Sequence, residues 1–306
     1  MTIELSTIDR TLREEGAERL VQRSDAALRE RLCGVAQSIE AGRMTRPFVL
    51  LAGPSGSGKT TVAEKLCLML RERGCHAHLL SMDHYFYPLD PEVSRRVDLE
   101  SPERVDRELL TEHLRRMAAG LPVEVPRFDF VSNTRVVKPE GRICRQPGEP
   151  VIVEGIHALN PETVCLPEEE TLQLYVSVCT SLETPDGVHI RPQSLRLLRR
   201  MLRDARTRGK SPEETLHRMA SVESGTTRYI RPYRCRAQRE IDTFLAYEPG
   251  LYRTLILHEL ERMAPDAELT PLLTLLRAAE PVEERFLPED SLCREFVGDG
   301  TEEKEV

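Results

Sequence analysis

The chain has 306 residues, of which 40% are hydrophobic and 31% are charged, and its formal net charge is −8. A negative balance disfavours a general nucleic-acid-binding protein, because the phosphate backbone of a nucleic acid attracts basic surfaces. No apolar stretch approaches the roughly 20 residues that a membrane-spanning helix needs, and the eight scattered cysteines contain no CxxC pair that would indicate a zinc site or a disulfide framework.

The first 44 residues carry apolar side chains at helical spacing, with Glu and Arg between them. The pattern predicts an N-terminal helical extension of one or two amphipathic helices, which dock on the main domain or on a partner subunit. A homo-oligomer is therefore left open. The segment has no basic stretch followed by an apolar core, so we expect no signal peptide and a cytoplasmic protein that binds neither membrane nor nucleic acid.

Short apolar strands then alternate with helices. Strands are expected at 48–52, 78–81, 151–153 and 172–178, and helices at 60–73, 101–120, 194–224 and 251–279, with Ser101 as the N-cap of the second helix. This alternation indicates an α/β fold with a mainly parallel sheet flanked by helices, spanning residues 45–280. Residues 281–306 are acidic and rich in Pro and Gly, so we expect a poorly ordered tail in which only 292–297 has the apolar character to pack on the body.

Residues 53–60 read Gly-Pro-Ser-Gly-Ser-Gly-Lys-Thr and match the phosphate-loop pattern G-x-x-x-x-G-K-[ST] in full. The glycines let the backbone curl so that its N–H groups point at a phosphate. Lys59 supplies positive charge for the β and γ oxygens, and the Thr60 hydroxyl suits Mg²⁺. Because the motif follows a strand and opens a helix, it predicts a P-loop fold that binds Mg·ATP or Mg·GTP. The predicted ATP-binding loop is Gly53, Pro54, Ser55, Gly56, Ser57, Gly58, Lys59, Thr60 and Thr61.

The strand at 151–153 ends in Glu154 followed by Gly155. Large ATPases usually end this strand in an Asp-Glu pair whose second acid activates water, whereas a single carboxylate suits a ligand of Mg²⁺ or a neighbour of the ion. The chain also lacks a base-reading NKxD motif of the GTPase kind. Both absences favour a kinase of a small molecule.

A kinase of a neutral alcohol needs a base near the attacking hydroxyl. Asp83 follows the second strand, whose carboxyl end faces the same crevice as the phosphate loop, so we predict that Asp83 is this base; the alternative is an Asp that caps the next turn. Six arginines crowd one segment in which Asp204 is the only nearby acid. This pattern predicts a lid that closes over ATP, and the alternative is a solvated helix face. These arginines are Arg196, Arg199, Arg200, Arg203, Arg206 and Arg208.

From about Phe48 to Leu260 the chain resembles the uridine/cytidine kinase branch of the phosphoribulokinase/uridine kinase family. The resemblance rests on five blocks in the family's order: GPSGSGKTT (53–61), SMDHYFYP (81–88), VPRFDFVSNTR (125–135), VIVEGIHALNP (151–161) and RLLRRMLRDARTRGKSPEETL (196–216). The first block is shared by many families, and the other four together are more specific. The sequence EGIHALNP and the ending SLCREFVG (291–298) are most similar to the bacterial uridine-kinase-like subgroup.

The resemblance implies roles at the matching positions. Asp83 would take the proton from a ribose 5′-hydroxyl, and Thr60, Asp83 and Glu154 would surround Mg²⁺. Lys59 and Arg203 would join Asp83 in catalysis, and Arg199 and Arg208 would bind ATP. The implied substrate-binding residues are Glu100, Phe128, Asn133, Arg200, Lys210 and Arg218.

Four of these positions depart from the family pattern. Phe128 stands where Tyr is usual, Asn133 where His is usual, Lys210 where Arg is common and Arg218 where Gln is usual. Changing groups that hydrogen-bond a base changes which base is chosen. The sequence therefore favours a kinase of a uridine-like or cytidine-like nucleoside and leaves the base open. The alternatives are a kinase of another alcohol, such as pantothenate or a sugar phosphate, and a nucleotide-binding regulatory protein.

Overall fold

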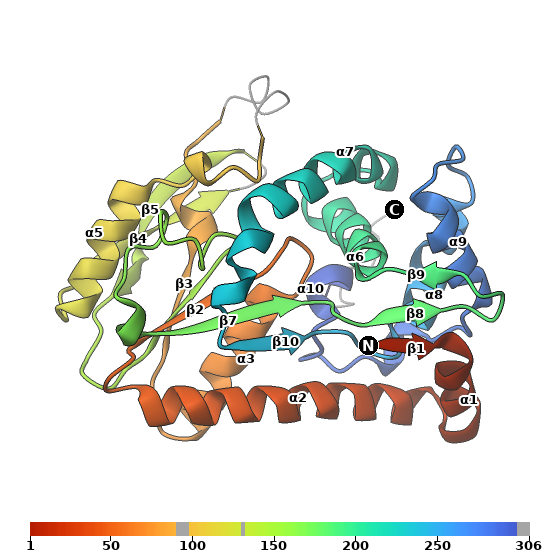
Figure 1. Cartoon of the computed structure of the whole chain (residues 1–306), viewed down its shortest axis with the longest axis horizontal. Helices are drawn as coiled ribbons and strands as arrows, with labels where there is room; N and C mark the ends of the chain where they lie inside the picture. Colours follow the sequence, from red (N-terminus) through yellow and green to blue (C-terminus); the bar gives the residue numbers. More distant parts are fainter. Residues whose placement is uncertain (90–97, 130–131, 299–306) are drawn as a thin grey trace.

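A computed structural model of the chain describes residues 1–89, 98–129 and 132–298 (Figure 1). Its centre is a five-stranded parallel sheet in the order β10-β7-β2-β6-β3. The strands are β2 (Phe48–Ala52), β3 (His78–Ser81), β6 (Val151–Glu154), β7 (Thr171–Ser177) and β10 (Arg239–Asp242). Helices cover both faces of this sheet, which confirms the predicted α/β fold.

The strand that leads into the phosphate loop lies in the middle of the sheet. All five residues of β2 are buried, and the strand pairs with β6 on one side and β7 on the other. A continuous apolar run is what a parallel strand covered on both faces requires. The helix that follows the loop, α3 (Lys59–Glu72), runs back along one face and buries Val62, Leu66 and Leu70.

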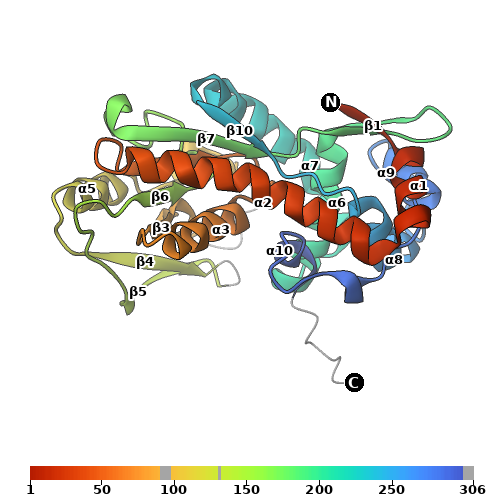
Figure 2. The same cartoon turned by 90° about the horizontal axis from the view of Figure 1, so that it is seen from below.

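The N-terminal segment packs on the body of the protein. Helix α1 (Leu5–Glu15) precedes α2 (Ala17–Gly42), which lies along the sheet beside α3 (Figure 2). Leu28, Leu32 and Ile39 of α2 are buried in the same apolar cluster as Leu66 of α3. The first residues also form β1 (Thr2–Glu4), which pairs with β8 (Ser181–Glu183) and, through it, β9 (His189–Ile190) in a second small sheet that the sequence did not reveal.

Two helix boundaries differ from the predicted ones. Ser101 caps only a short 3-10 turn, Pro102–Arg104, and α5 (Arg107–Ala118) begins later, where the Asp106 side chain accepts from the Leu109 N–H at 3.1 Å. The predicted helix at 251–279 is two helices, α8 (Glu248–Leu260) and α9 (Leu269–Ala278). Pro265 lies between them, and a proline in a helix interior removes a backbone hydrogen bond and clashes with the preceding turn.

The remaining elements surround the carboxyl edge of the sheet. The hairpin of β4 (Val123–Asp129) and β5 (Thr134–Ile143), which was not predicted, packs beside α5. Helices α6 (Pro192–Thr207) and α7 (Pro212–Gly225) form the arginine-rich region, and Ser211 and Glu214 make a capping box at the start of α7. Among the residues that the structure describes, no helix has both the length and the apolar character to cross a bilayer.

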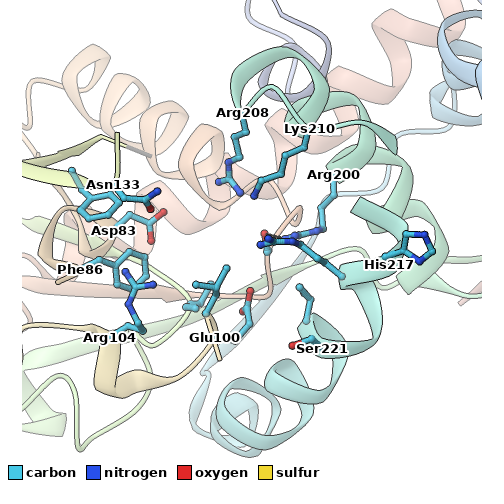
Figure 3. A pocket seen from close by; sticks show the side chains of 16 residues that line it. Asp83, Phe86, Glu100, Arg104, Asn133, Arg200, Arg208, Lys210, His217 and Ser221 are labelled. Atoms are coloured by element: carbon cyan, nitrogen blue, oxygen red, sulfur yellow. Dashed lines mark hydrogen bonds between the residues drawn. The ribbon is translucent and has the colours of Figure 1, made fainter. Parts of the chain in front are cut away.

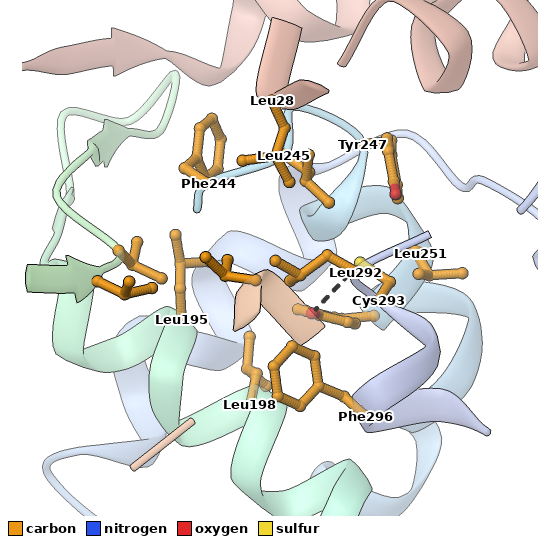
Figure 4. Packing of buried hydrophobic residues seen from close by; sticks show 14 of the residues in the cluster. Leu28, Leu195, Leu198, Phe244, Leu245, Tyr247, Leu251, Leu292, Cys293 and Phe296 are labelled. Atoms are coloured by element: carbon orange, nitrogen blue, oxygen red, sulfur yellow. Dashed lines mark hydrogen bonds between the residues drawn. The ribbon is translucent and has the colours of Figure 1, made fainter. Parts of the chain in front are cut away.

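Residues 281–298 pack on the body, so the expected poorly ordered tail is wrong there, whereas the packing expected for 292–297 is observed. Leu292, Cys293 and Phe296 are buried among Leu195, Leu198 and Leu251 (Figure 4). This cluster includes the short helix α10 (Arg294–Val297) and side chains from α6 and α8. Acidic composition concealed the buried apolar residues that precede this stretch, such as Val282 and Leu287, and residues 299–306 lie outside the described part.

A half-buried carboxylate, Asp25, connects an N-terminal helix with the C-terminal segment and makes stability depend on pH. Asp25 of α2 accepts from the Tyr247 hydroxyl at 3.1 Å and from the Ser291 hydroxyl at 3.4 Å. Burial raises the pKa of Asp25 to about 6. This pKa lies above the value of Asp25 in the unfolded chain. The contribution of protonated Asp25 to the free energy of unfolding is therefore full at pH below about 4 and is lost as pH rises through about 6.

We therefore expect Asp25→Asn to change the pH dependence of stability. Relative to the variant, the free energy of unfolding of the wild type should fall by about 1–3 kcal/mol between pH 4.5 and pH 8. Urea unfolding across this range measures the difference. A constant difference between the two proteins at every pH would contradict a half-buried, proton-binding Asp25.

Candidate active site

The phosphate loop needs glycine where it leaves the sheet. A Cβ on Gly53 would lie 1.9 Å from the Val176 carbonyl oxygen of β7, so no other residue fits there without moving the backbone. Gly56 and Gly58 have φ of 76° and 83°, in the left-handed region that glycine adopts at low cost. The loop thus curls tightly before α3 begins at Lys59, and the N–H groups of the first turn of α3 have no partner within the helix.

A buried ion pair supports the loop from below. The Arg199 guanidinium is fully buried and donates to Glu248 from both Nε and Nη2. It also donates to the Thr243 carbonyl at 2.7 Å and to the Gly56 carbonyl at 3.4 Å, while the Thr243 hydroxyl donates to the Ser57 carbonyl at 2.7 Å. Arg199, predicted to bind ATP, therefore lies beneath the loop and contacts its backbone.

Three further arginines of α6 converge on one loop residue, Ser55. Arg196 donates to its carbonyl oxygen at 3.2 Å, and Arg200 and Arg203 donate to its hydroxyl. Ser55 lies in the loop that the motif assigns to phosphates, so these positive charges lie over the predicted phosphate position.

A single acid holds this arginine group together. Asp204 is 2% exposed and pairs with Arg203 at 2.8 Å, Arg208 at 3.4 Å and Arg200 at 3.7 Å. Burial opposes ionisation of Asp204, but the three arginines outweigh it and lower its pKa. Arg196, Arg199 and Arg200 are also buried, so the alternative of a solvated helix face does not describe this part of α6.

The loop and α6 border a cleft of about 460 Å³ (Figure 3). Its walls are the hairpin, the turn after β3, and the helices α6 and α7. Nine predicted residues meet there: Ser55, Asp83, Glu100, Phe128, Asn133, Arg200, Arg208, Lys210 and Arg218. The cleft also contains residues that the sequence gave no reason to choose, namely Phe86, Leu99, Arg104, Ile156, His217, Ser221 and Val222.

Two carboxylates, those of Asp83 and Glu154, lie at the ends of neighbouring strands. Asp83 belongs to the 3-10 turn Met82–Tyr85 directly after β3, and Glu154 ends β6, paired in register with Ser81. The Ser81 hydroxyl donates to Glu154. Burial, followed by the negative charge of Asp83, raises the pKa of Glu154 to about 7. This edge of the sheet therefore concentrates negative charge beside the phosphate loop.

A third carboxylate, Glu100, lies on the opposite wall. Its side chain is buried, and its Oε2 has no hydrogen-bond partner among the described residues. Burial raises the pKa of Glu100, and the charge of Arg200 partly offsets this. The close approach of Glu100 to α7 requires Gly225, where a Cβ would lie 2.4 Å from that of Glu100. Glu100 is thus a buried acceptor that lines the cleft, and its Oε2 has no donor within the described part of the chain.

The aromatic and amide side chains of the cleft come from the unpredicted elements. Phe128 of β4 meets Phe86 edge to face, with ring centroids 6.1 Å apart, and Arg104 lies 5.3 Å from the Phe86 ring centre. Asn133 occupies the hairpin turn with φ of 53°, a conformation that Asn tolerates better than most residues. No sequence pattern marked Arg104 or Phe86, because their roles depend on a turn and a hairpin placed by the fold.

Several predicted residues lie outside the lining of the cleft. Lys59 is buried at the start of α3, with its ammonium group 3.4 Å from the Pro54 carbonyl, and Thr60 is exposed at the same helix end. Glu154 is buried and is not among the residues that line the cleft. His84 accepts from the Phe128 N–H at 3.3 Å, and burial lowers the pKa of His157 to about 4. The contact with Phe128 places His84 against the hairpin wall of the cleft.

Comparison with known proteins finds related kinases. The model of the phosphoribulokinase/uridine kinase family matches residues 48–244. A uridine kinase of Staphylococcus carnosus (strain TM300) is 33% identical over 175 residues, which cover 56% of this chain and 74% of that protein. A uridine kinase of Lactobacillus johnsonii is 30% identical over 192 residues, 61% of this chain and 82% of that protein. The fold is shared with a solved candidate fructose transport system kinase from Silicibacter sp. TM1040, with a TM-score of 0.51, 21% identity and coverage of 68% of this chain and 98% of that one.

Proposed function

The chain belongs to the phosphoribulokinase/uridine kinase family and is a phosphotransferase with an alcohol acceptor, and from this premise we propose that it transfers the γ-phosphoryl group of ATP, or of GTP, to the 5′-hydroxyl of a nucleoside. One observation carries the proposal. The phosphate-loop residue Ser55 and the carboxylates of Asp83 and Glu100 line the same cleft, and the Oε2 of Glu100 has no partner among the residues that the structure describes.

Asp83 is the proposed general base. It accepts the proton of the acceptor hydroxyl as the new oxygen–phosphorus bond forms and the bond from the γ-phosphorus to the β-phosphate oxygen breaks. Lys59, Arg200, Arg203 and Arg208 offset the negative charge on the transferring group and on the departing nucleoside diphosphate. The contacts of Arg200 and Arg203 with Ser55 already place them over the loop.

The donor set at the sheet edge fits Mg²⁺. Thr60, Asp83 and Glu154 offer a hydroxyl and two carboxylates, and oxygen ligands are those that Mg²⁺ prefers. Burial, followed by the negative charge of Asp83, raises the pKa of Glu154, and a divalent cation beside the two acids would favour their ionised forms. When bound, the ion neutralises charge on the β and γ phosphates. The three residues would hold it beside the loop.

On the acceptor side we propose that Glu100 accepts from the two ribose hydroxyls. Phe128, beside Phe86, gives an apolar face for the base. Lys210 and Arg218 can only donate hydrogen bonds, whereas Asn133 both donates and accepts. These groups suit a base that presents carbonyl oxygens and one further polar group, as uracil and cytosine do.

Glu100→Gln tests the acceptor side. Gln retains the size but loses the charge, so we expect the KM for ribonucleosides to rise by roughly 10-fold or more while the KM for ATP changes little. The wild type should prefer ribonucleosides to 2′-deoxyribonucleosides, and the variant should lose most of that preference. Initial-rate kinetics of the wild type and the variant, each with ribonucleosides and with 2′-deoxyribonucleosides, measure both effects. An unchanged preference would show that Glu100 does not hold the ribose.

A panel of acceptors with labelled ATP tests the function as a whole. Phosphorylation of uridine or cytidine supports the proposal. Turnover of pantothenate or ribulose 5-phosphate without turnover of any nucleoside would replace it with a kinase of another alcohol. Failure with every acceptor despite ATP binding would favour the regulatory alternative.

A further inference from the structure

A segment outside the family-matched region contacts the start of the phosphate-loop helix. The backbone N–H and the hydroxyl of Thr61 both donate to Glu295 of α10, at 3.3 Å and 2.7 Å. Leu292 lies against the loop, so close that a Cβ on Gly58 would be 2.9 Å from its Cδ1. The ammonium group of Lys65, one turn further along α3, is 3.1 Å from the Asp290 carboxylate.

Apolar anchors fix this segment independently of Glu295. Leu292 and Phe296 are almost completely buried in the cluster drawn in Figure 4. The Arg199 guanidinium, which supports the loop from below, lies 5.0 Å from the centre of the Phe296 ring. The anchors therefore hold the backbone of α10 beside the loop, while the half-buried Glu295 side chain can still rotate.

The Thr61 N–H is a group that a nucleotide would use. It belongs to the first turn of α3, where N–H groups lack partners within the helix and favour negative charge. In a phosphate loop the backbone N–H groups of the loop and of this turn cradle the α and β phosphates. A carboxylate and a phosphate cannot both accept from one N–H without their negative charges meeting at short distance.

From these contacts we propose that Glu295 competes with the nucleotide's phosphates for Thr61 and so sets the affinity for ATP. This inference rests on the ATP half of the proposed function and is independent of the acceptor. In the free protein Glu295 satisfies the helix end. When ATP binds, the side chain must leave that position, so its charge weakens binding by an amount that depends on ionic strength.

A second carboxylate lies near Glu295. Glu64, on the exposed side of the same helix turn, has its pKa raised by burial and then by the charge of Glu295. The two acids therefore repel each other near this helix end. Removing the charge at position 295 relieves this repulsion for the incoming phosphates.

Glu295→Gln keeps the acceptor oxygen and removes the charge. We expect the Kd of ATP, measured by calorimetry at low ionic strength, to fall about tenfold, and the difference to shrink as salt is added. The Kd of adenosine, which has no phosphate, should not change. Asp290→Asn is the matched control, because it removes a charge from the same segment without touching Thr61, and it should leave the Kd of ATP within about twofold of the wild-type value.

Each outcome decides the proposal. Thermal unfolding without nucleotide shows whether Glu295→Gln is folded. If Glu295→Gln is not folded, Glu295→Asp is used instead. This variant keeps the charge on a shorter side chain and should bind ATP like the wild type. Equal or weaker ATP binding by a folded Glu295→Gln would mean that Glu295 only caps α3, and would overturn this inference alone. Absence of ATP binding in wild type and variant alike would overturn the proposed function as well.

A second, independent cluster lies at the opposite edge of the sheet. His78 begins β3, and Glu149 precedes β6, so both are at the amino ends of strands whose carboxyl ends form the cleft. His78 Nε2 is 2.8 Å from Glu149 Oε2, and His76 Nδ1 is 3.5 Å from Glu149 Oε1. The three ligand atoms all lie within 4.8 Å of one another.

The geometry points to a site for a divalent transition metal. Two imidazoles and a carboxylate suit Zn²⁺, Co²⁺ or Ni²⁺ rather than Mg²⁺, and ligand atoms around a tetrahedral ion lie about 3.3 Å apart. The two distances to Glu149 are already close to this spacing. The His76 side chain is 55% exposed, so it can move to complete the site. A bound ion would tie the loop before β3 to the loop before β6.

Calorimetry with Ni²⁺ on the reduced, full-length protein tests this site. We expect one ion per chain, and His76→Gln should weaken binding at least tenfold without loss of fold, because the side chain is exposed. His217→Gln is the matched control, since His217 and Glu213 form a pair 3.8 Å apart with no third ligand nearby in the described residues. Unchanged Ni²⁺ binding in His76→Gln, or a Co²⁺ spectrum with sulfur-to-metal bands that would place the ion on cysteines, would overturn the site.

Discussion

Replacing Asp83 with Asn should lower kcat by about 10²- to 10⁴-fold, because the amide cannot accept the proton of the acceptor hydroxyl. Asn is nearly the same size, so the turn at Met82–Tyr85 should be kept. The contacts of the phosphate loop with ATP come from elements other than the turn that carries Asp83, so the variant should still bind ATP. Steady-state kinetics with the best acceptor, combined with calorimetric ATP titration, measure both properties.

A matched control separates this effect from a general loss of charge. Asp186 is an exposed residue in the turn between β8 and β9, and Asp186→Asn should leave kcat unchanged. If Asp83→Asn kept kcat within threefold of the wild-type value, Asp83 could not be the base. If a partner-regulating output persisted in Asp83→Asn while the wild type showed no turnover, the regulatory alternative would hold.

Glu248→Gln should destabilise the protein by about 3–5 kcal/mol, because it leaves the fully buried guanidinium of Arg199 without a compensating charge. The loss should extend to nucleotide binding, since Arg199 also holds the Gly56 carbonyl and, through Thr243, the Ser57 carbonyl. The free energy of unfolding from urea titration, and the Kd of ATP, are the measured quantities.

The paired variant Arg199→Met with Glu248→Leu distinguishes a buried ion pair from a simple loss of contacts. The double variant should be more stable than either single variant, since it removes both charges from the interior. Glu261→Gln serves as the exposed control: its pair with Arg277 has a similar separation of 2.9 Å but is solvated, so the change should cost less than about 1 kcal/mol. Additive losses in the double variant would contradict the predicted coupling.

The parts of the protein that depend on short stretches of sequence were predictable. The glycines and Lys59 of the phosphate loop encode their own backbone shape and charge, and the apolar runs at 48–52, 78–81, 151–153 and 172–178 match β2, β3, β6 and β7 closely. The order of strands and helices then implied a parallel sheet whose carboxyl edge brings the loop and Asp83 to one cleft, as observed.

Contacts between residues far apart in the chain could not be read in this way. Arg199 resembles its neighbours in the sequence, yet it lies beneath the loop because Glu248 and Thr243 meet it there. Arg104 and Phe86 enter the cleft only because a 3-10 turn and the hairpin place them there, and Glu295 reaches Thr61 across 234 residues of chain.

The sequence by itself determined the phosphate-binding loop, the parallel α/β architecture and the side of the sheet that carries the chemistry, because periodicity, glycine conformations and helix ends are local properties of the chain. Only the tertiary structure decided which arginines face the cleft, what supports the loop and which segment touches the helix that follows the loop. Those outcomes depend on burial and on pairing between distant charges, and both are fixed only when the whole core assembles.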